Sequence, residues 1–135
     1  MYTVRINPIK NRMYLTLKGR MDVLELRNFI GTALDEGRKL KPGFGVSTDI
    51  SEFIVLGEEM RQVLEVFLRE LKGLGAGPVV RVVNPLAPIL SLQWQRTSWK
   101  VGYTAENVAT LWQADQKLDE LENKQIVWMS TTTNA

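Results

Sequence analysis

The 135-residue sequence contains no cysteine and no histidine. Without cysteine there is no disulfide, no thiolate nucleophile and no zinc–thiolate site, and without histidine the commonest general base is missing. Carboxylate, lysine, tyrosine and serine chemistry remain, together with oxygen-only sites for hard cations. No motif for any of these is found, so we predict a protein that is not an enzyme and that uses neither a metal nor a cofactor.

Long apolar runs are also missing, and none approaches the ~20 residues that cross a bilayer. The N-terminal residues 1–6 alternate like a strand and lack the basic start and apolar stretch of a secretory signal. We therefore expect a soluble, cytoplasmic protein without membrane insertion. The length and a hydrophobic content of 44% suit one domain, which we place over residues 1–122, with a C-terminal tail over 123–135.

The net charge of +2 is unevenly distributed, because nine of the 17 Lys and Arg residues fall within residues 1–42. A basic first third could meet an acidic partner or nucleic acid. However, Arg5, Lys10, Arg12, Lys18 and Arg20 lie on or beside two alternating strands, where exposed charges prevent edge-to-edge association. There is no aromatic interleaving and no arginine cluster among them, so a nucleic-acid partner is not expected.

The hydrophobic periodicity predicts an α/β domain. Alternation over 2–6 and 13–18 indicates an antiparallel hairpin, and helical spacing after the N-cap Asp22 extends to Gly37. A strand ending at Ile50, an amphipathic helix over 57–74 and a valine-rich strand over 79–83 follow, which predicts a parallel crossover. We expect a mixed sheet of four or five strands with about four flanking helices.

The C-terminal third is expected to hold a short third helix, an extended segment at 101–103 and a fourth helix capped by Thr104. That helix would direct one set of residues inward, namely Val108, Leu111, Trp112 and Leu118, and would leave Asp115, Asp119, Glu120 and Glu122 outward. In the tail, residues 126–129 form a short, uncharged, strand-prone run. We expect this run to pack on an apolar surface or to extend a sheet edge, either within the domain or in a homodimer.

The segment from Lys41 to Phe53 combines a turn, a buried strand and an acidic strand end. Gly57-Glu-Glu, an amphipathic helix and the strand at 79–83 come next. This order resembles the central part of the STAS (anti-sigma-factor antagonist, SpoIIAA-like) family, and especially small stand-alone bacterial proteins of that fold. The resemblance implies a regulatory, protein-interaction domain. Family members usually carry a phosphorylated Ser or Thr after the central strand, but here Gly57, Glu58, Glu59 and Met60 occupy that run and the switch hydroxyl is missing.

Several polar residues near this segment are candidates for a site. Glu58 and Glu59 could imitate a phosphorylated residue, although capping of a helix N-terminus accounts for both. Asp49 is expected to accept hydrogen bonds from backbone N–H groups nearby, and Ser51 or Thr48 could be modified. Arg81 lies among valines, so we expect it to pair with Asp49 or Glu52, which is favoured over a ligand clamp.

Trp94, Trp99 and Tyr103 lie within ten residues, with Arg96 and Lys100 between them. Such a group can anchor a protein interface or line a pocket for a small apolar ligand, or it can belong to the core. Helical spacing does not bury both tryptophans on one face, so at least one should be partly exposed. Two functions remain open: a protein-interaction domain with an unidentified protein partner, or a protein that binds or senses a small apolar ligand or lipid.

Overall fold

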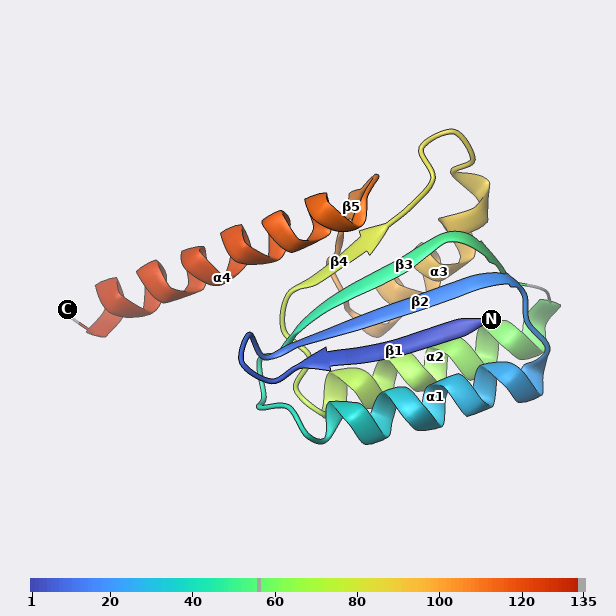
Figure 1. The fold of residues 1–135 in the computed structure, drawn as a ribbon, viewed down its shortest axis with the longest axis horizontal. Helices are drawn as coiled ribbons and strands as arrows, with labels where there is room; N and C mark the ends of the chain where they lie inside the picture. The colour runs from blue at the N-terminus through green and yellow to red at the C-terminus, as the bar shows by residue number, and fades with distance from the viewer. Residues whose placement is uncertain (56, 134–135) are drawn as a thin grey trace.

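The computed structural model describes residues 1–55 and 57–133, with side chains described up to Asn123. Within these residues the chain forms an α/β fold with five strands and four helices (Figure 1). In chain order they are β1 (Tyr2–Asn7), β2 (Arg12–Arg20), α1 (Val23–Gly37), β3 (Gly45–Ile54), α2 (Gly57–Gly73), β4 (Val79–Val82), α3 (Ile89–Val101), β5 (Glu106–Val108) and α4 (Leu111–Thr133). The predicted fold class is confirmed.

The strands form one mixed sheet in the order β1-β2-β3-β4-β5. β1 pairs antiparallel with β2, which confirms the predicted hairpin, and Tyr2 lies opposite Leu17. All other neighbours are parallel, and helices α1, α2 and α3 each connect one parallel strand to the next. The predicted crossover from β3 through α2 to β4 is therefore present.

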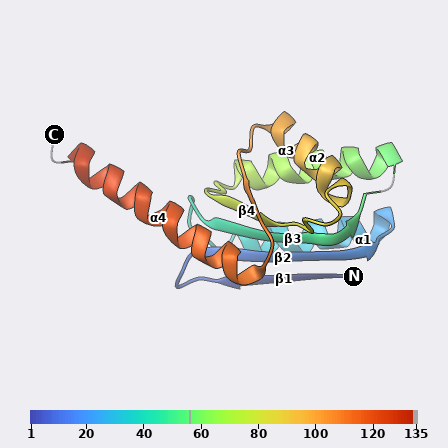
Figure 2. The same ribbon diagram turned by 90° about the horizontal axis from the view of Figure 1, so that it is seen from above.

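The helices cover both faces of the sheet. Figure 2 shows α2 and α3 on one side and the start of α4 on the other. The larger hydrophobic cluster lies under α1, α2 and α3, whereas Val80 and Val82 of β4 pack against Ala114 and Leu118 of α4. β4 is thus covered on both faces, as its valine-rich sequence predicted. None of the helices described is long and apolar enough to cross a membrane.

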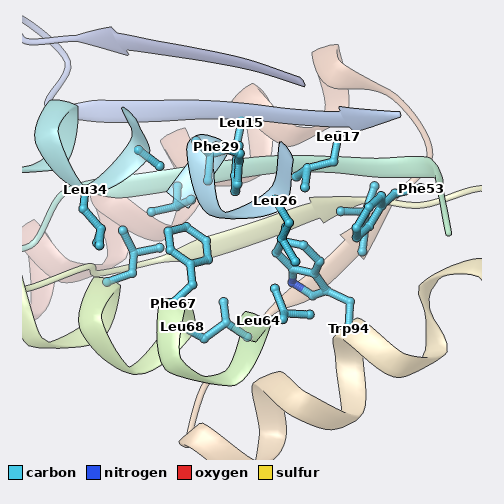
Figure 3. Packing of buried hydrophobic residues seen from close by; sticks show 14 of the residues in the cluster. Leu15, Leu17, Leu26, Phe29, Leu34, Phe53, Leu64, Phe67, Leu68 and Trp94 are labelled. Carbon is cyan, nitrogen blue, oxygen red and sulfur yellow. The ribbon is translucent and has the colours of Figure 1, made fainter. Parts of the chain in front are cut away.

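The main core is built from large aliphatic and aromatic side chains between the sheet and helices α1 to α3 (Figure 3). Phe29 and Phe67 meet edge to face with ring centroids 5.4 Å apart, and Phe53 and Trp94 meet in the same way at 6.0 Å. Buried side chains of the two central strands and of α2 include Val46, Ile50, Leu64, Phe67, Val80 and Val82.

β3 is longer than predicted, because it continues beyond Ile50 to Ile54 through a bulge. Thr16 pairs with Asp49 but Lys18 pairs with Glu52, so β3 carries one extra residue in this interval. A bulge of this kind shifts the alternation of side chains by one position. As a result Ile50 and Phe53, three residues apart, are both buried in the main core.

The predicted N-terminal cap of α1 is correct, whereas the predicted N-terminal cap of α4 is wrong. Asp22 caps α1, since its Oδ1 accepts a hydrogen bond from the backbone N–H of Glu25 at 2.7 Å. The cap of α4 is Thr110 instead of Thr104: the Thr110 hydroxyl accepts from the N–H of Gln113, and the Gln113 side chain accepts from the N–H of Thr110. This reciprocal arrangement is a capping box.

The shifted start changes which residues of α4 face inward. Leu118 is buried as predicted, but Leu111 and Trp112 are exposed. The predicted extended segment at 101–103 is also wrong. Gly102, with a φ of 96°, ends α3 in a left-handed conformation, and the edge strand is β5, which begins at Glu106.

Arg12 contradicts the expectation that the N-terminal basic residues are all exposed. It is buried on the sheet face that α4 covers and contacts Asp115, Asp119 and Glu122, three of the residues predicted to face outward. The backbone of α4 continues through the predicted tail boundary to Thr133, so residues 126–129 are helical and not a strand. How their side chains pack lies outside the described residues.

Candidate functional site

Asp49 and Ser51 are joined at the β3 bulge. Oδ1 of Asp49 accepts hydrogen bonds from the Ser51 backbone N–H at 3.1 Å and from the Ser51 hydroxyl at 2.6 Å. A bulge leaves the extra residue without a partner in the ladder, so Asp49 supplies the acceptor that the neighbouring strand does not. The predicted role of Asp49 as a backbone acceptor is confirmed, and the Ser51 hydroxyl is held by a carboxylate.

Glu58 and Glu59 both lie in the first turn of α2 and are exposed. Glu58 forms an ion pair with Arg61 one turn later, with Arg61 Nε 2.9 Å from Glu58 Oε2. The hydrogen bond from Arg61 lowers the pKa of Glu58, and the same pair raises the pKa of Arg61. The Glu58 charge is neutralised within its own helix, which favours a structural role over imitation of a phosphate.

The two glutamates face different hollows of the surface. Glu58 and Arg61 line a hollow of about 250 Å³ together with Val55, Gly57 and Gln93, between the start of α2 and α3. Glu59 borders a groove of about 500 Å³ between α1 and α2. The start of α2 and the neighbouring part of α3 therefore border one surface hollow.

The outer face of α3 presents apolar side chains to solvent. Leu86, in the loop before the helix, is 93% exposed, Ile89 is 77% exposed and Trp99 is 64% exposed. Ile89, Leu92, Arg96 and Trp99 recur at helical spacing, so they form one stripe, which we call the α3 stripe. Its exposure confirms that one tryptophan of the aromatic group lies at the surface.

The other members of the aromatic group are buried: Trp94 lies on the inner face of α3 and Tyr103 follows its end. Both belong to the main core, and the Tyr103 hydroxyl has no hydrogen-bond partner in the part of the chain that the structure describes. Burial raises the pKa of Tyr103 well above its ordinary value. Lys72 lies over the Tyr103 ring at 5.9 Å and donates to the backbone carbonyl of Val101. These contacts fix the end of α3 against α2.

Arg81 points to the α3 side of β4 and is 1% exposed. The predicted ion pair with Asp49 or Glu52 is wrong, because Asp49 binds Ser51 and Glu52 lies near Lys18. Arg81 instead donates from Nη2 to the hydroxyl of Ser98 on α3, and its Nε has no partner among the described side chains. Burial lowers the pKa of Arg81 from its ordinary value to about 10.

Arg81, Ser98 and Tyr103 line one cavity between β4 and α3, and its other walls include Leu15, Phe67 and Trp94. About 10 Å³ of it is open to the centre of a water-sized sphere. Arg81 and Tyr103 were predicted as candidate residues, but Ser98 was not. The one indication in the sequence is that Ser98 follows Trp94 by four residues, which puts both on the buried side of α3.

Two other missed residues are arginines in ion pairs. Arg61 pairs with Glu58 within α2, whereas Arg12 pairs with acidic residues of α4. In the described part of the chain no group of three acidic side chains is arranged to hold a metal ion. No family model matches the chain, and the comparison with curated proteins gives no match either.

Proposed function

We propose that this chain is a non-enzymatic, STAS-like regulatory domain that binds another protein through the α3 stripe and the adjoining start of α2. The observation that carries the proposal is the exposure of Ile89 and Trp99 on one helix face. Large exposed aromatic and aliphatic side chains bordered by arginine are typical of the residues that dominate binding energy at protein interfaces. Burying them against a partner would remove apolar area from water.

The polar border of the stripe supports the same assignment. Glu65 of α2 contacts Lys100 at 2.9 Å and Arg69 at 3.7 Å, so charged side chains flank the apolar residues. Protein interfaces commonly combine an apolar centre with a polar rim. In the STAS family, which the element order resembles, the regulatory region is the start of the helix after the central strand, and in this chain the start of α2 adjoins Gln93 of α3.

The alternative, a small apolar ligand under α3, is less well supported. The cavity beneath this helix has about 10 Å³ open to the centre of a water-sized sphere. Pockets for small organic molecules measure roughly 300–1,000 Å³. A ligand of several carbon atoms would have to displace core side chains such as Phe67 or Trp94, which costs packing energy.

The test is affinity capture from a lysate of the native cell with the full chain as bait. A double variant, Ile89→Asp with Trp99→Ala, alters the α3 stripe, and Trp112→Ala alters a residue that is 69% exposed on α4. We expect wild type and Trp112→Ala to retain a protein that the double variant loses, with circular dichroism showing that all three are folded. Equal capture by the double variant would contradict the proposal.

A further inference from the structure

The buried guanidinium of Arg81 lacks a counter-charge among the described residues. None of the ion pairs within residues 1–55 and 57–123 includes Arg81. A pKa of about 10 leaves the group protonated at neutral pH. Burying a charge without a paired opposite charge is costly, so such groups in proteins are nearly always neutralised by an anion or a carboxylate.

The protein elements around Arg81 do not supply that negative charge. Thr48 of β3 lies opposite Arg81 on one side, and Asn107 of β5 lies opposite it on the other side. Asp49 is one residue further along β3 and holds Ser51. From α2, Glu65 contacts Lys100. Within the described part of the chain, the hydrogen bond of the guanidinium is to the neutral hydroxyl of Ser98.

A second buried donor lies in the same cavity. Among the residues that the structure describes, the Tyr103 hydroxyl has no hydrogen-bond partner, and the raised pKa keeps it protonated. Ser98 accepts from Arg81, so its own hydrogen remains free to point elsewhere. Arg81, Ser98 and Tyr103, three residues that each carry a hydrogen-bond donor, therefore line the same cavity.

We infer that the cavity between β4 and α3 binds one monatomic anion of the halide class, held by Arg81, Ser98 and Tyr103. An anion satisfies the donors and the buried charge together, whereas a water molecule satisfies only the donors. The small size of the cavity restricts the ligand to a single atom, so carboxylates and oxyanions with several heavy atoms do not fit. The site lies on the inner side of α3, opposite the α3 stripe.

Chloride is the probe, measured in two ways. The line width of the ³⁵Cl NMR signal reports exchange of chloride with a protein site. The thermal midpoint is followed as sodium chloride replaces sodium gluconate at constant ionic strength. A ligand that binds only the folded state raises the midpoint further with each tenfold increase above its Kd. We expect saturable line broadening and a rising midpoint for the wild-type chain.

Arg81→Met keeps the apolar stem and removes the charge, so both effects should disappear. Arg38→Met, at an exposed arginine that follows α1, is the matched control and should behave like wild type. Tyr103→Phe removes one donor to an anion and should weaken chloride binding about tenfold or more. Should Arg81→Met not fold, the comparison of Tyr103→Phe with wild type carries the test. Unsaturable broadening in the wild type, or equal effects in wild type and the Arg81 and Tyr103 variants, would overturn the inference and assign the cavity to water.

Discussion

Arg12 and Glu122, 110 residues apart in the sequence, form a two-point ion pair that joins β2 to α4. Arg12 Nε lies 3.0 Å from Glu122 Oε1, and Arg12 Nη2 lies 3.0 Å from Glu122 Oε2. Burial would lower the pKa of Arg12, but hydrogen bonds with Glu122 and Asp119 outweigh it and raise the pKa. The network therefore attaches α4 to the face of the sheet that the other three helices leave open.

The first prediction concerns this attachment. Arg12→Met should lower the free energy of unfolding by about 1–3 kcal/mol, because hydrogen bonds to charged groups are lost. The loss stays below that of a fully buried pair, since the Asp119 and Glu122 side chains are 58% and 33% exposed and can return to water. Urea unfolding measures the change. Arg38→Met removes an exposed pair with Asp35 and should change stability by less than about 1 kcal/mol; equal losses in the two variants would contradict the assignment.

The role of Arg12 could not be read from the sequence, and the reason is physical. Alternation along β2 shows that Arg12 and Met13 lie on opposite faces, but it does not show whether a helix covers the second face. The answer depended on where α4 begins. Thr110 and Gln113 form a capping box that is visible in the sequence, and recognising it would have placed Asp115, Asp119 and Glu122 on the face toward the sheet.

The hydrophobic pattern of the sequence predicted some of the other elements well and others poorly. The core residues of α2 were predicted correctly, since a helix with one apolar face has a single way to bury it. The end of β3 was predicted wrongly, because the bulge changes the alternation of buried and exposed side chains on which that prediction relied. β5 has three residues, too few for a period to be read. For the candidate site, exposure of one tryptophan followed from spacing, but the partner of Arg81 depended on the arrangement of β4 and α3.

The second prediction tests the core. Phe67 is fully buried and packs edge to face on Phe29. Phe67→Ala should lower the free energy of unfolding by about 3–5 kcal/mol, through lost transfer energy and the cavity that remains. Val66→Ala changes the adjacent position, which is 54% exposed, and should cost about 0.5 kcal/mol or less. Denaturant unfolding of both variants gives the comparison, and a small effect for Phe67→Ala would refute the described packing.

The third prediction is that phosphorylation near the start of α2 is not the regulatory switch. Ser51 donates its hydroxyl to Asp49 at 2.6 Å, so a phosphate there would lie beside a carboxylate and be repelled. Thr48 is buried. Incubation with a lysate of the native cell and ATP, followed by mass spectrometry, should find neither residue modified to a substantial fraction. Stoichiometric phosphorylation of Ser51 that changes partner affinity would show the prediction to be wrong.

The last prediction concerns alkaline pH. Because burial raises the pKa of Tyr103 above its ordinary value of 10.0, its phenol ionises near pH 10 only in the unfolded chain. The folded state then binds more protons, so stability is retained below pH 10 and falls as the pH rises above it, by up to about 1.4 kcal/mol per pH unit. Tyr103→Phe lacks this contribution. In chloride-free buffer its stability should therefore decline less steeply than that of wild type.

Arg81 acts in the opposite direction over the same range. Its pKa is lowered to about 10 from the ordinary value for arginine, so above pH 10 the unfolded state binds more protons and stability rises with pH. Arg81→Met removes that gain, and its stability should fall more steeply than that of wild type. Urea midpoints on both sides of pH 10 for the three proteins measure the slopes. Parallel curves would show that neither group titrates differently in the folded state, and the burial of both in one cavity would be refuted.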